Sequence, residues 1–397
     1  MRVLLLENIH PEAAKAFEAA GFKVAAVPQS LGKKVLGQMM EDVAVLGIRS
    51  KTRVGPDLLH RAPSLAAIGA FCIGTEQIDL PACCAKGVAV FNAPYSNTRS
   101  VVELALGEMI LLLRGVSESN SRLHRGIWSK TAAGSHEIRG KRLGIVGYGN
   151  IGSQLSVLAE SLGMEVWYHD IAEKLSLGNA RRRPLKEILR HCDIVTVHVD
   201  GRDSNRNLIG EKEFAAMKEG AIFLNLSRGF VVDVDSLARH LRSGRLRGAA
   251  ADVFPEEPES GKEPFSSPLQ GIPNVILTPH VGGSTEEAQA GIGAFVARRI
   301  LDYLATGSTT SSVNMPVYQP LGPPARHRFA HLHENIPGML ARINDAFARR
   351  GVNIAGQHLE TRGPVGYAIV DVDGPYDQSL LRDIETIPHT IRARVVY

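Results

Sequence analysis

The sequence predicts an α/β chain with two doubly wound parallel-sheet domains followed by a small ferredoxin-like domain. Three observations lead to this fold class. Short apolar runs alternate with helical segments through most of the first 300 residues, which is typical of parallel sheets. A glycine-rich turn joins an apolar run to a helix near residue 147, and a βαββαβ order of elements fills residues 326–397. That last order is the ferredoxin-like arrangement.

The first predicted domain begins with short apolar runs that would form its sheet. A helix starts after Pro11 and ends at Gly21, between the first two runs. The loops IRSKT and FCIGT each follow a predicted strand, where doubly wound sheets bind their ligands. Arg49 and Lys51, in the first of these loops, could therefore contact an anion, or they could be solvated surface residues. The apolar runs lie at residues 3–6, 24–27, 44–48, 66–68 and 88–91.

The second predicted domain covers residues 97–284 and contains the glycine-rich unit. Gly147, Gly149 and Gly152 follow an apolar run at G-x-G-x-x-G spacing and precede a helical segment. These glycines permit a tight turn, close approach of the backbone to a pyrophosphate, and close packing of helix on strand. Asp170 ends the next apolar run, where an acid accepts hydrogen bonds from a ribose 2′-hydroxyl and repels a 2′-phosphate. The sequence therefore predicts NAD rather than NADP.

A long helix near residues 101–115 precedes this unit, and further strands follow it. These strands are expected at residues 193–199, 221–226, 248–253 and 275–278. Ser284 and Glu287 have capping-box spacing and predict a helix that runs to about Leu304. Such a helix can return to the first domain, which is then discontinuous and comprises residues 1–96 and 285–310.

Residues 311–325 are expected to form a linker, because the stretch around them is rich in Ser, Thr, Gly and Pro. The domain beyond it, residues 326–397, is expected to form strands at 329–333, 352–360, 367–372 and 391–396. Its two helices are expected at 338–350 and 378–387.

Composition excludes several functional classes. A net charge of +4 without long basic blocks gives no reason to expect nucleic acid as a partner. The four cysteines lack C-x-x-C spacing, so neither a disulfide framework nor a metal site is expected. No apolar stretch is long enough for a signal peptide or a membrane span. We therefore expect a cytoplasmic protein with reduced thiols.

Three side chains at predicted strand ends carry the chemistry of hydride transfer from a 2-hydroxy acid. His280 follows the strand that ends near Thr278, and its imidazole can act as the base for the hydroxyl proton. Glu257 can orient this ring and raise its pKa. Arg228 offers a planar fork for the substrate carboxylate. Each residue alone could be an ordinary surface residue, but their joint occurrence in one dinucleotide-binding domain favours catalysis.

The motifs NAPYSNTRSVVELALGEMILLLR, GYGNIG, NLSRG, DVFPEEP, LTPHVGGST and HLHENIPGML resemble the D-isomer-specific 2-hydroxyacid dehydrogenase family, in particular bacterial members that act on 3-phospho-D-glycerate. The resemblance covers essentially the whole chain and assigns Arg228, Glu257 and His280 the catalytic roles given above. It implies NAD-dependent oxidation of 3-phospho-D-glycerate to 3-phosphooxypyruvate, the entry step of L-serine biosynthesis, and implies that Arg49 helps to bind substrate. Besides the three glycines, Asp170, Arg228 and His280, the implied cofactor-binding residues are Asn150, Ile151, Leu226, Ser227, Asp252, Gly282 and Gly283.

One departure from the family pattern concerns the phosphate of the substrate. A lysine that some relatives carry shortly before the IRSKT loop has no clear counterpart, and Pro28 or Gln29 stands near that place. A reductase of another 2-oxo acid, such as 2-oxoglutarate or hydroxypyruvate, would need the same three catalytic residues. A non-catalytic NAD-sensing protein is the alternative from another class, and it would not need them.

The last domain is similar to ACT domains, which bind amino acids at subunit interfaces. His333 and Asn335 lie where a strand ends and a helix begins, and Asn353 follows that helix. Family members carry serine-contacting residues at these three positions, so the resemblance implies feedback inhibition by L-serine. It also implies a homo-oligomer, a tetramer or a dimer. The bland alternative is that this domain only adds subunit interface.

Overall fold

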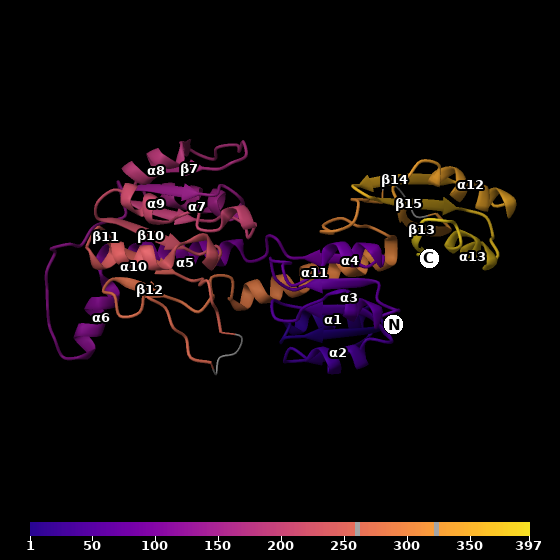
Figure 1. Cartoon of the computed structure of the whole chain (residues 1–397), viewed down its shortest axis with the longest axis horizontal. Helices are drawn as coiled ribbons and strands as arrows, with labels where there is room; N and C mark the ends of the chain where they lie inside the picture. The colour runs from indigo at the N-terminus through magenta and orange to yellow at the C-terminus, as the bar shows by residue number, and fades with distance from the viewer. Residues whose placement is uncertain (259–262, 321–324) are drawn as a thin grey trace. The chain divides into compact units, whose positions relative to one another are not determined.

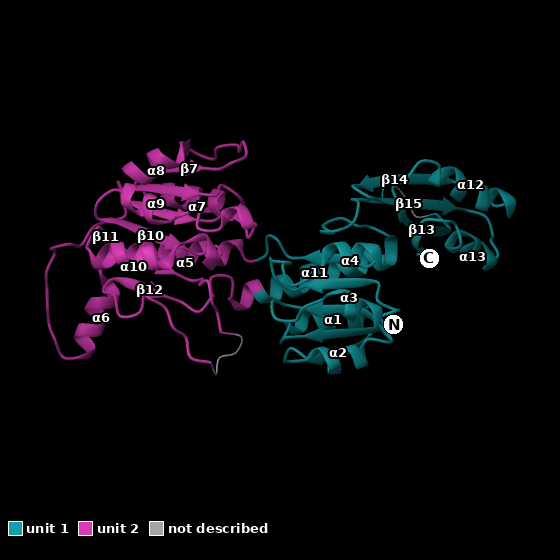
Figure 2. Ribbon diagram, viewed as in Figure 1, with its two compact units in different colours: residues 1–96, 289–397 teal, residues 97–288 magenta. Residues whose placement is uncertain are grey.

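The computed structural model describes residues 1–258, 263–320 and 325–397. The chain packs into two compact units, residues 1–96 with 289–397 (unit 1) and residues 97–288 (unit 2), as Figure 2 shows. Parallel sheets make up unit 2 and the N-terminal part of unit 1, which confirms the predicted fold class. None of the helices in the described part of the chain is long and apolar enough to cross a membrane.

Unit 2 is built on a seven-stranded sheet in the order β12-β11-β10-β9-β6-β7-β8, and every pairing is parallel. Helices cover both faces (Figure 1). One face packs on α5 and α7 through residues such as Ile145 and Leu224. The other packs on α8, α9 and α10 through residues such as Val195 and Phe223. Because side chains alternate along a strand, nearly continuous apolar runs fill both cores.

The strands of unit 2 are β6 (Arg142–Val146), β7 (Glu165–His169), β8 (Arg181–Arg182), β9 (Ile194–Val197), β10 (Ala221–Asn225), β11 (Leu246–Ala251) and β12 (Val275–Leu277). Its helices are α5 (Thr98–Arg114), α6 (Val116–His124), α7 (Asn150–Ser161), α8 (Leu185–His191), α9 (Glu211–Ala216) and α10 (Val234–Arg242), with short 3-10 turns at Asp203–Asn205 and Gly229–Val231. The order of the strands changes direction between β6 and β9, where open α/β sheets bind ligands.

The N-terminal sheet of unit 1 is also parallel, in the order β2-β1-β3-β4-β5. Its strands are β1 (Arg2–Leu6), β2 (Lys23–Val27), β3 (Val43–Ile48), β4 (Ala67–Ala70) and β5 (Ala89–Asn92). One face packs on α1 (Pro11–Ala19) and α11 (Glu286–Thr306). The other packs on α2 (Lys33–Met39), α3 (Pro56–His60) and α4 (Leu80–Ala85).

The helix predicted from Ser284 begins two residues later, at Glu286. The hydroxyl of Thr285, rather than that of Ser284, accepts the backbone N–H of Ala288 at 3.1 Å. The predicted capping residue was therefore wrong by one position. Both residues carry a hydroxyl, so composition could not distinguish them.

The C-terminal part of unit 1 is an antiparallel sheet in the order β14-β15-β13-β16, with α12 and α13 on one face (Figure 1). Its other face, which includes Leu332 and Tyr367, shares a core with Tyr303 of α11. The Tyr367 hydroxyl donates to Gly307 O at 2.9 Å. The elements are β13 (His327–Glu334), α12 (Met339–Arg349), β14 (Gly356–Arg362), β15 (Val365–Val372), α13 (Ser379–Glu385) and β16 (Thr390–Val395).

The segment predicted as a linker is not a free tether over its described part. Val313 N donates to Val90 O at 2.9 Å, and the Asn314 side chain accepts from Val90 N at 2.8 Å and donates to Val88 O at 2.9 Å. The side chains of Ser312 and Asn314 thus help to hold the segment against β5 and the residue before it, which composition alone did not indicate. Residues 321–324 of the predicted linker, Pro323 among them, lie outside the described residues, and the four-part domain division stays a prediction.

Candidate active site

Four loops of unit 2 follow parallel strands and therefore gather at one edge of its sheet. The glycine-rich turn follows β6. The other three loops follow β10, β11 and β12, and they carry Arg228, Glu257 and His280 respectively. Since all these residues belong to one unit, the geometry of the site can be described from unit 2 alone.

The glycine-rich turn has the backbone that the motif predicts. Gly147 has a φ of +95°, and a Cβ there would lie 2.6 Å from His198 O. A Cβ at Gly152 would overlap the carbonyl of Gly147, so helix α7 packs tightly on the turn. At Gly149, by contrast, a Cβ would meet no atom within 4 Å. The two outer glycines are therefore required by the fold, whereas the middle one faces open space.

Helix α7 begins at this turn with Gly149 as its N-cap and no side-chain cap. Asn150 and Ile151 form its first turn, where free backbone N–H groups and the helix dipole favour a phosphate. The glycine turn fits a dinucleotide by three features: open space at Gly149, N–H groups without a side-chain cap, and a nearby acid.

That acid is Asp170, directly after β7. Its Oδ2 accepts the Tyr148 backbone N–H at 2.8 Å, and its Oδ1 accepts that of Ala172 at 2.8 Å. The carboxylate is thus fixed between the glycine turn and its own loop. Each oxygen keeps a further lone pair for the ribose hydroxyls that the sequence analysis assigned to it.

Arg228 is positioned by a turn that Asn225 organises. The Asn225 side chain accepts from Ser227 N at 3.1 Å and Ser227 Oγ at 2.8 Å, and donates to Arg228 O at 3.0 Å. Arg228 Nη1 donates to Ser227 O at 2.9 Å, which directs the guanidinium. The next residue must be Gly229, because a Cβ there would overlap the backbone of Phe254. This close approach brings the Arg228 loop against the loop that carries Glu257.

His280 and Glu257 form a hydrogen-bonded pair. The distance from His280 Nδ1 to Glu257 Oε2 is 2.8 Å. A carboxylate only accepts, so Nδ1 carries the proton and Nε2 of the neutral ring is left with a lone pair. The hydrogen bond to Glu257 raises the pKa of His280, against an opposing effect of burial. Burial raises the pKa of Glu257, but the bond to His280 and the charges of His280 and Arg228 outweigh it, so the net shift is downward.

The backbone of His280 is held in an uncommon conformation. Its φ is +55°, which non-glycine residues rarely adopt. His280 N donates to Asp252 O at 2.8 Å and to Thr278 O at 3.0 Å. Such a conformation persists only where the surroundings fix it, and it often occurs at active sites.

Asp252 contributes much of what holds the His280 backbone in this conformation. It is 2% exposed, and its Oδ1 accepts from Thr278 Oγ1 at 2.6 Å and from Val281 N at 2.8 Å. Its Oδ2 accepts from Gly282 N at 2.8 Å. Of the predicted cofactor residues, Gly282 and Gly283 lie in the loop that carries His280, and Asp252, directly after β11, is hydrogen-bonded to that loop. Leu226 and Ser227 lie in the Arg228 turn. We call Asp252 and its bonds to residues 278–282 the Asp252 hub.

Two features of this site were not predicted from the sequence. Phe254 N donates to Glu257 Oε1 at 3.1 Å and so fixes the second oxygen of the carboxylate. Glu108 on α5 is 2% exposed, and the charge of Asp252 acts on it. Glu108 comes seven residues after Val101 and three after Ala105, so all three lie on one face of α5. This spacing was the signal in the sequence that could have predicted the burial of Glu108.

Arg49, predicted to bind substrate, lies in unit 1 after β3. Its carbonyl accepts from Gln77 Nε2 at 2.5 Å. The carboxylate of Glu7 accepts from Lys51 N at 3.0 Å and from Thr52 N at 2.7 Å. The IRSKT loop is therefore well ordered by its own neighbours, and the role of Arg49 stays a prediction.

The predicted effector residues lie in the C-terminal part of unit 1. His333 is 1% exposed, and its Nδ1 bonds to Glu334 O at 2.8 Å. Asn335 donates from Nδ2 to Gly363 O at 3.0 Å, and Asn353 is exposed. His333 is therefore buried in this chain, while the two asparagines are accessible.

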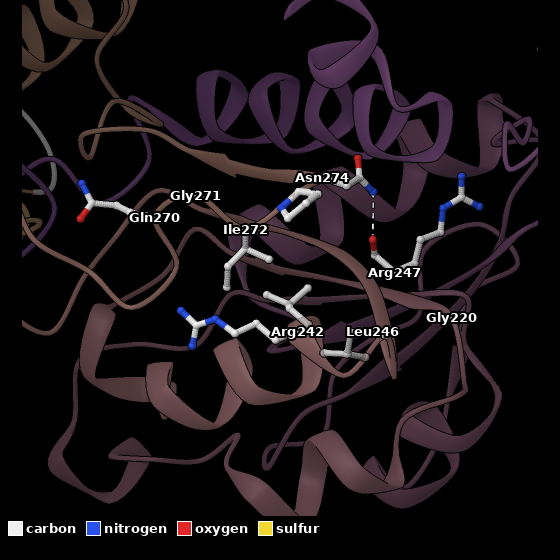
Figure 3. Close-up of a pocket in the computed structure, with 11 residues that line it drawn as sticks. Gly220, Arg242, Leu246, Arg247, Gln270, Gly271, Ile272 and Asn274 are labelled. Atoms are coloured by element: carbon white, nitrogen blue, oxygen red, sulfur yellow. Dashed lines mark hydrogen bonds between the residues drawn. The ribbon is translucent and has the colours of Figure 1, made fainter. Parts of the chain in front are cut away.

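A cavity of about 680 Å³ lies elsewhere in unit 2 (Figure 3). Its lining includes Gly220, Leu246 and Asn274, which stand at the amino ends of β10, β11 and β12. It lies at the opposite edge of the sheet from His280, so it is not the candidate active site. In the described part of the chain, no cluster of His, Cys, Asp or Glu could hold a metal ion.

Comparison with known proteins gives the family. A family profile described as "D-isomer specific 2-hydroxyacid dehydrogenase, NAD binding domain" matches residues 106–282, so the cofactor is NAD. A second, described as "AHAS small subunit-like ACT domain", matches residues 329–392. A solved structure, the TT0316 protein from Thermus thermophilus, superposes with a TM-score of 0.72 at 27% identity and covers 79% of this chain and 100% of that one.

Curated relatives match over the full length. The D-3-phosphoglycerate dehydrogenase of Haemophilus influenzae is 49% identical, with 100% of this chain and 97% of the relative covered. That of Escherichia coli K12 is 48% identical, with 100% and 98% covered. The enzyme of the same name from Dictyostelium discoideum is 46% identical, with 100% and 97% covered. The chain therefore belongs to the D-3-phosphoglycerate dehydrogenases of the D-isomer-specific 2-hydroxyacid dehydrogenase family.

Proposed function

We propose that this chain catalyses the NAD-dependent oxidation of 3-phospho-D-glycerate to 3-phosphooxypyruvate, the entry step of L-serine biosynthesis. The observation that carries the proposal is the His280–Glu257 pair, joined at 2.8 Å and acted on by the charge of Arg228. Full-length relatives of 46–49% identity that bear this enzyme name support the choice of substrate.

In this mechanism each of the three residues has one task. The Nε2 lone pair of His280 takes the proton of the substrate hydroxyl, and Arg228 binds the carboxylate on the neighbouring carbon. The glycine turn, Asn150, Ile151 and Asp170 would hold NAD, whose nicotinamide would supply the acceptor for the hydride that leaves C2. Glu257 stabilises the imidazolium that forms, because its carboxylate already holds Nδ1–H. The oxidation needs a neutral His280, and the reverse reduction needs a protonated one.

A steady-state assay of NADH formation tests the substrate. In the forward direction the panel contains 3-phospho-D-glycerate, D-glycerate and D-2-hydroxyglutarate. In the reverse direction, where NADH consumption is followed, it contains 3-phosphooxypyruvate, hydroxypyruvate and 2-oxoglutarate. We expect the highest kcat/KM with the phosphorylated acid in each direction. A higher value for an unphosphorylated acid in the same direction would overturn the substrate assignment. That alternative is suggested by Pro28 and Gln29, which stand near the place where some relatives carry a lysine.

We also propose that L-serine inhibits the enzyme through His333, Asn335 and Asn353 of the ACT domain. The test is titration of L-serine against the intact chain and against Asn335→Ala, with Asn344→Ala on α12 as the matched control. Inhibition should be lost only in Asn335→Ala. Equal inhibition of all three proteins would place the serine site elsewhere, and no inhibition of the intact chain would leave the domain with an assembly role.

A homotetramer or a homodimer is part of this proposal, since the second asparagine is expected from a neighbouring subunit. Light scattering of the purified chain gives the mass directly. A monomer would contradict the shared site. A cytoplasmic location remains our expectation.

A further inference from the structure

Glu108 is a buried acid that the proposed mechanism does not use. It lies on the face of α5 that also carries Val101, Ala105 and Leu112, and this face packs into the core beside β10 and β11. The side chain is 2% exposed, and neither carboxyl oxygen has a hydrogen-bond partner among the described residues. An ionised carboxylate without partners is very costly to bury, so a group placed in this way is expected to keep its proton.

The electrostatics of this position agree. Burial, and after it the charge of Asp252, together raise the pKa of Glu108 to about 8. Asp252 follows β11, one of the strands packed against α5. Among the described residues its charge is the one that acts on Glu108. Near pH 7 Glu108 therefore keeps its proton.

The Asp252 carboxylate holds the loop of His280. Asp252 accepts hydrogen bonds from Thr278, Val281 and Gly282, and its carbonyl accepts from His280 N. A second anion beside it would repel the Asp252 carboxylate in a region from which water is excluded. The repulsion would weaken the hub, and the left-handed backbone of His280 depends on the hub.

We propose that Glu108 is a positioning residue. As a neutral acid it preserves the hydrogen bonds of the Asp252 hub and, through them, the backbone conformation of the His280 loop. Loss of its proton opens the hub, lowers the affinity for NADH and displaces His280. The part about His280 rests on the proposed function. The part about NADH does not, because it needs only that Asp252, Gly282 and Gly283 line the dinucleotide site, as the family resemblance implies.

The test is the pH dependence of NADH binding, followed by NADH fluorescence from pH 6 to 10, in the wild type and Glu108→Gln. Glutamine keeps the shape and cannot ionise. Glu103→Gln is the matched control, because Glu103 lies on the exposed face of the same helix, paired with Arg99. Wild type and Glu103→Gln should lose about tenfold in affinity for each pH unit above the point where Glu108 ionises, while Glu108→Gln stays flat. An identical alkaline loss in all three proteins would overturn the proposal.

Thermal unfolding gives a second test. If Glu108 had only a packing role, the Tm difference between wild type and Glu108→Gln would not depend on pH. A folded-state pKa above the unfolded value means that the native state holds an extra proton, so wild-type stability falls as pH rises from about 4.5 to about 8. The Tm advantage of Glu108→Gln should therefore grow over this range and then level off. A constant difference would contradict an ionising Glu108. If Glu108→Gln does not fold, Glu108→Met, of similar length and unable to ionise, carries the same two tests.

The two proposals can fail separately. If 3-phospho-D-glycerate is not oxidised but the alkaline loss of NADH affinity disappears in Glu108→Gln, the substrate assignment is wrong and the role of Glu108 stands. If the substrate is oxidised and the alkaline loss of NADH affinity persists in Glu108→Gln, the substrate assignment stands and the role of Glu108 is wrong.

Discussion

Replacing Gly149 by alanine tests whether the middle glycine of the motif is needed for binding the cofactor or for stabilising the fold. Its backbone, with φ −83° and ψ −152°, is extended and suits alanine. A methyl group there meets no atom within 4 Å. Stability should therefore be unchanged, or rise by about 0.4–1 kcal/mol because the unfolded chain loses freedom.

The effect on binding should be large by comparison. If the pyrophosphate lies against the Gly149 backbone, the methyl group occupies its place, and overpacking of this kind costs about 1–3 kcal/mol. This corresponds to a rise of roughly 5- to 150-fold in the Kd for NADH. Calorimetric titration with NADH and thermal unfolding measure the two quantities on one preparation.

Two other glycines serve as references. Gly107→Ala, on the exposed face of α5 with no atom within 4 Å, should leave the Kd unchanged. Gly147→Ala should destabilise the fold itself, because its φ is +95° and its Cβ would lie 2.6 Å from His198 O. An unchanged Kd in Gly149→Ala would refute the reasoning, since the open space beside this glycine would then have no link to the dinucleotide.

Three further substitutions test the proposed catalytic residues, and a fourth tests the proposed cofactor-binding role of Asp170. His280→Ala should lower kcat by about 10²- to 10⁴-fold while NADH still binds; normal turnover would exclude His280 as the base. Glu257→Gln should move the acidic limb of the kcat profile for oxidation to lower pH, because the hydrogen bond that raises the pKa of His280 is lost; an unmoved limb would mean that another group titrates. Arg228→Lys should lower kcat/KM for the acid by roughly 10- to 150-fold, as expected for a lost charged hydrogen bond of about 1.5–3 kcal/mol, and an unchanged value would point to another cation, Arg49 first. Asp170→Asn should narrow the preference of kcat/KM for NAD over NADP, and a wild type that uses both cofactors equally would remove Asp170 from this role.

The sequence predicted best those features that depend on neighbours along the chain. The turn at Gly147 and the strand–helix alternation arise from local backbone needs and from apolar periodicity, and both are present. The capping hydroxyl was placed one residue early, at Ser284 rather than Thr285, because neighbouring hydroxyls look alike in a pattern.

Features that depend on distant contacts could not be predicted in this way. The polar stretch near Asn314 looked like a free linker, but its side chains bond to Val88 and Val90, more than 200 positions earlier in the chain. Glu108 interrupts the apolar stretch from about Leu104 to Leu113, and the sequence does not show that its side chain is buried. Its burial and the charge of Asp252 that acts on it follow only from the packing of α5 against β11.

The discontinuity of unit 1 has a consequence for synthesis on the ribosome. Strands β1 to β5 end at Asn92, but Ile292, Val296 and Ile300 of α11, which complete one face of their core, lie about 200 residues later. At translation rates of about 5–20 residues per second, the nascent sheet waits roughly 10–40 s for its covering helix. Unit 2, which is continuous in sequence, can fold during this interval. Unit 1 therefore closes last, and until then the part of its apolar face that α11 covers stays exposed to water.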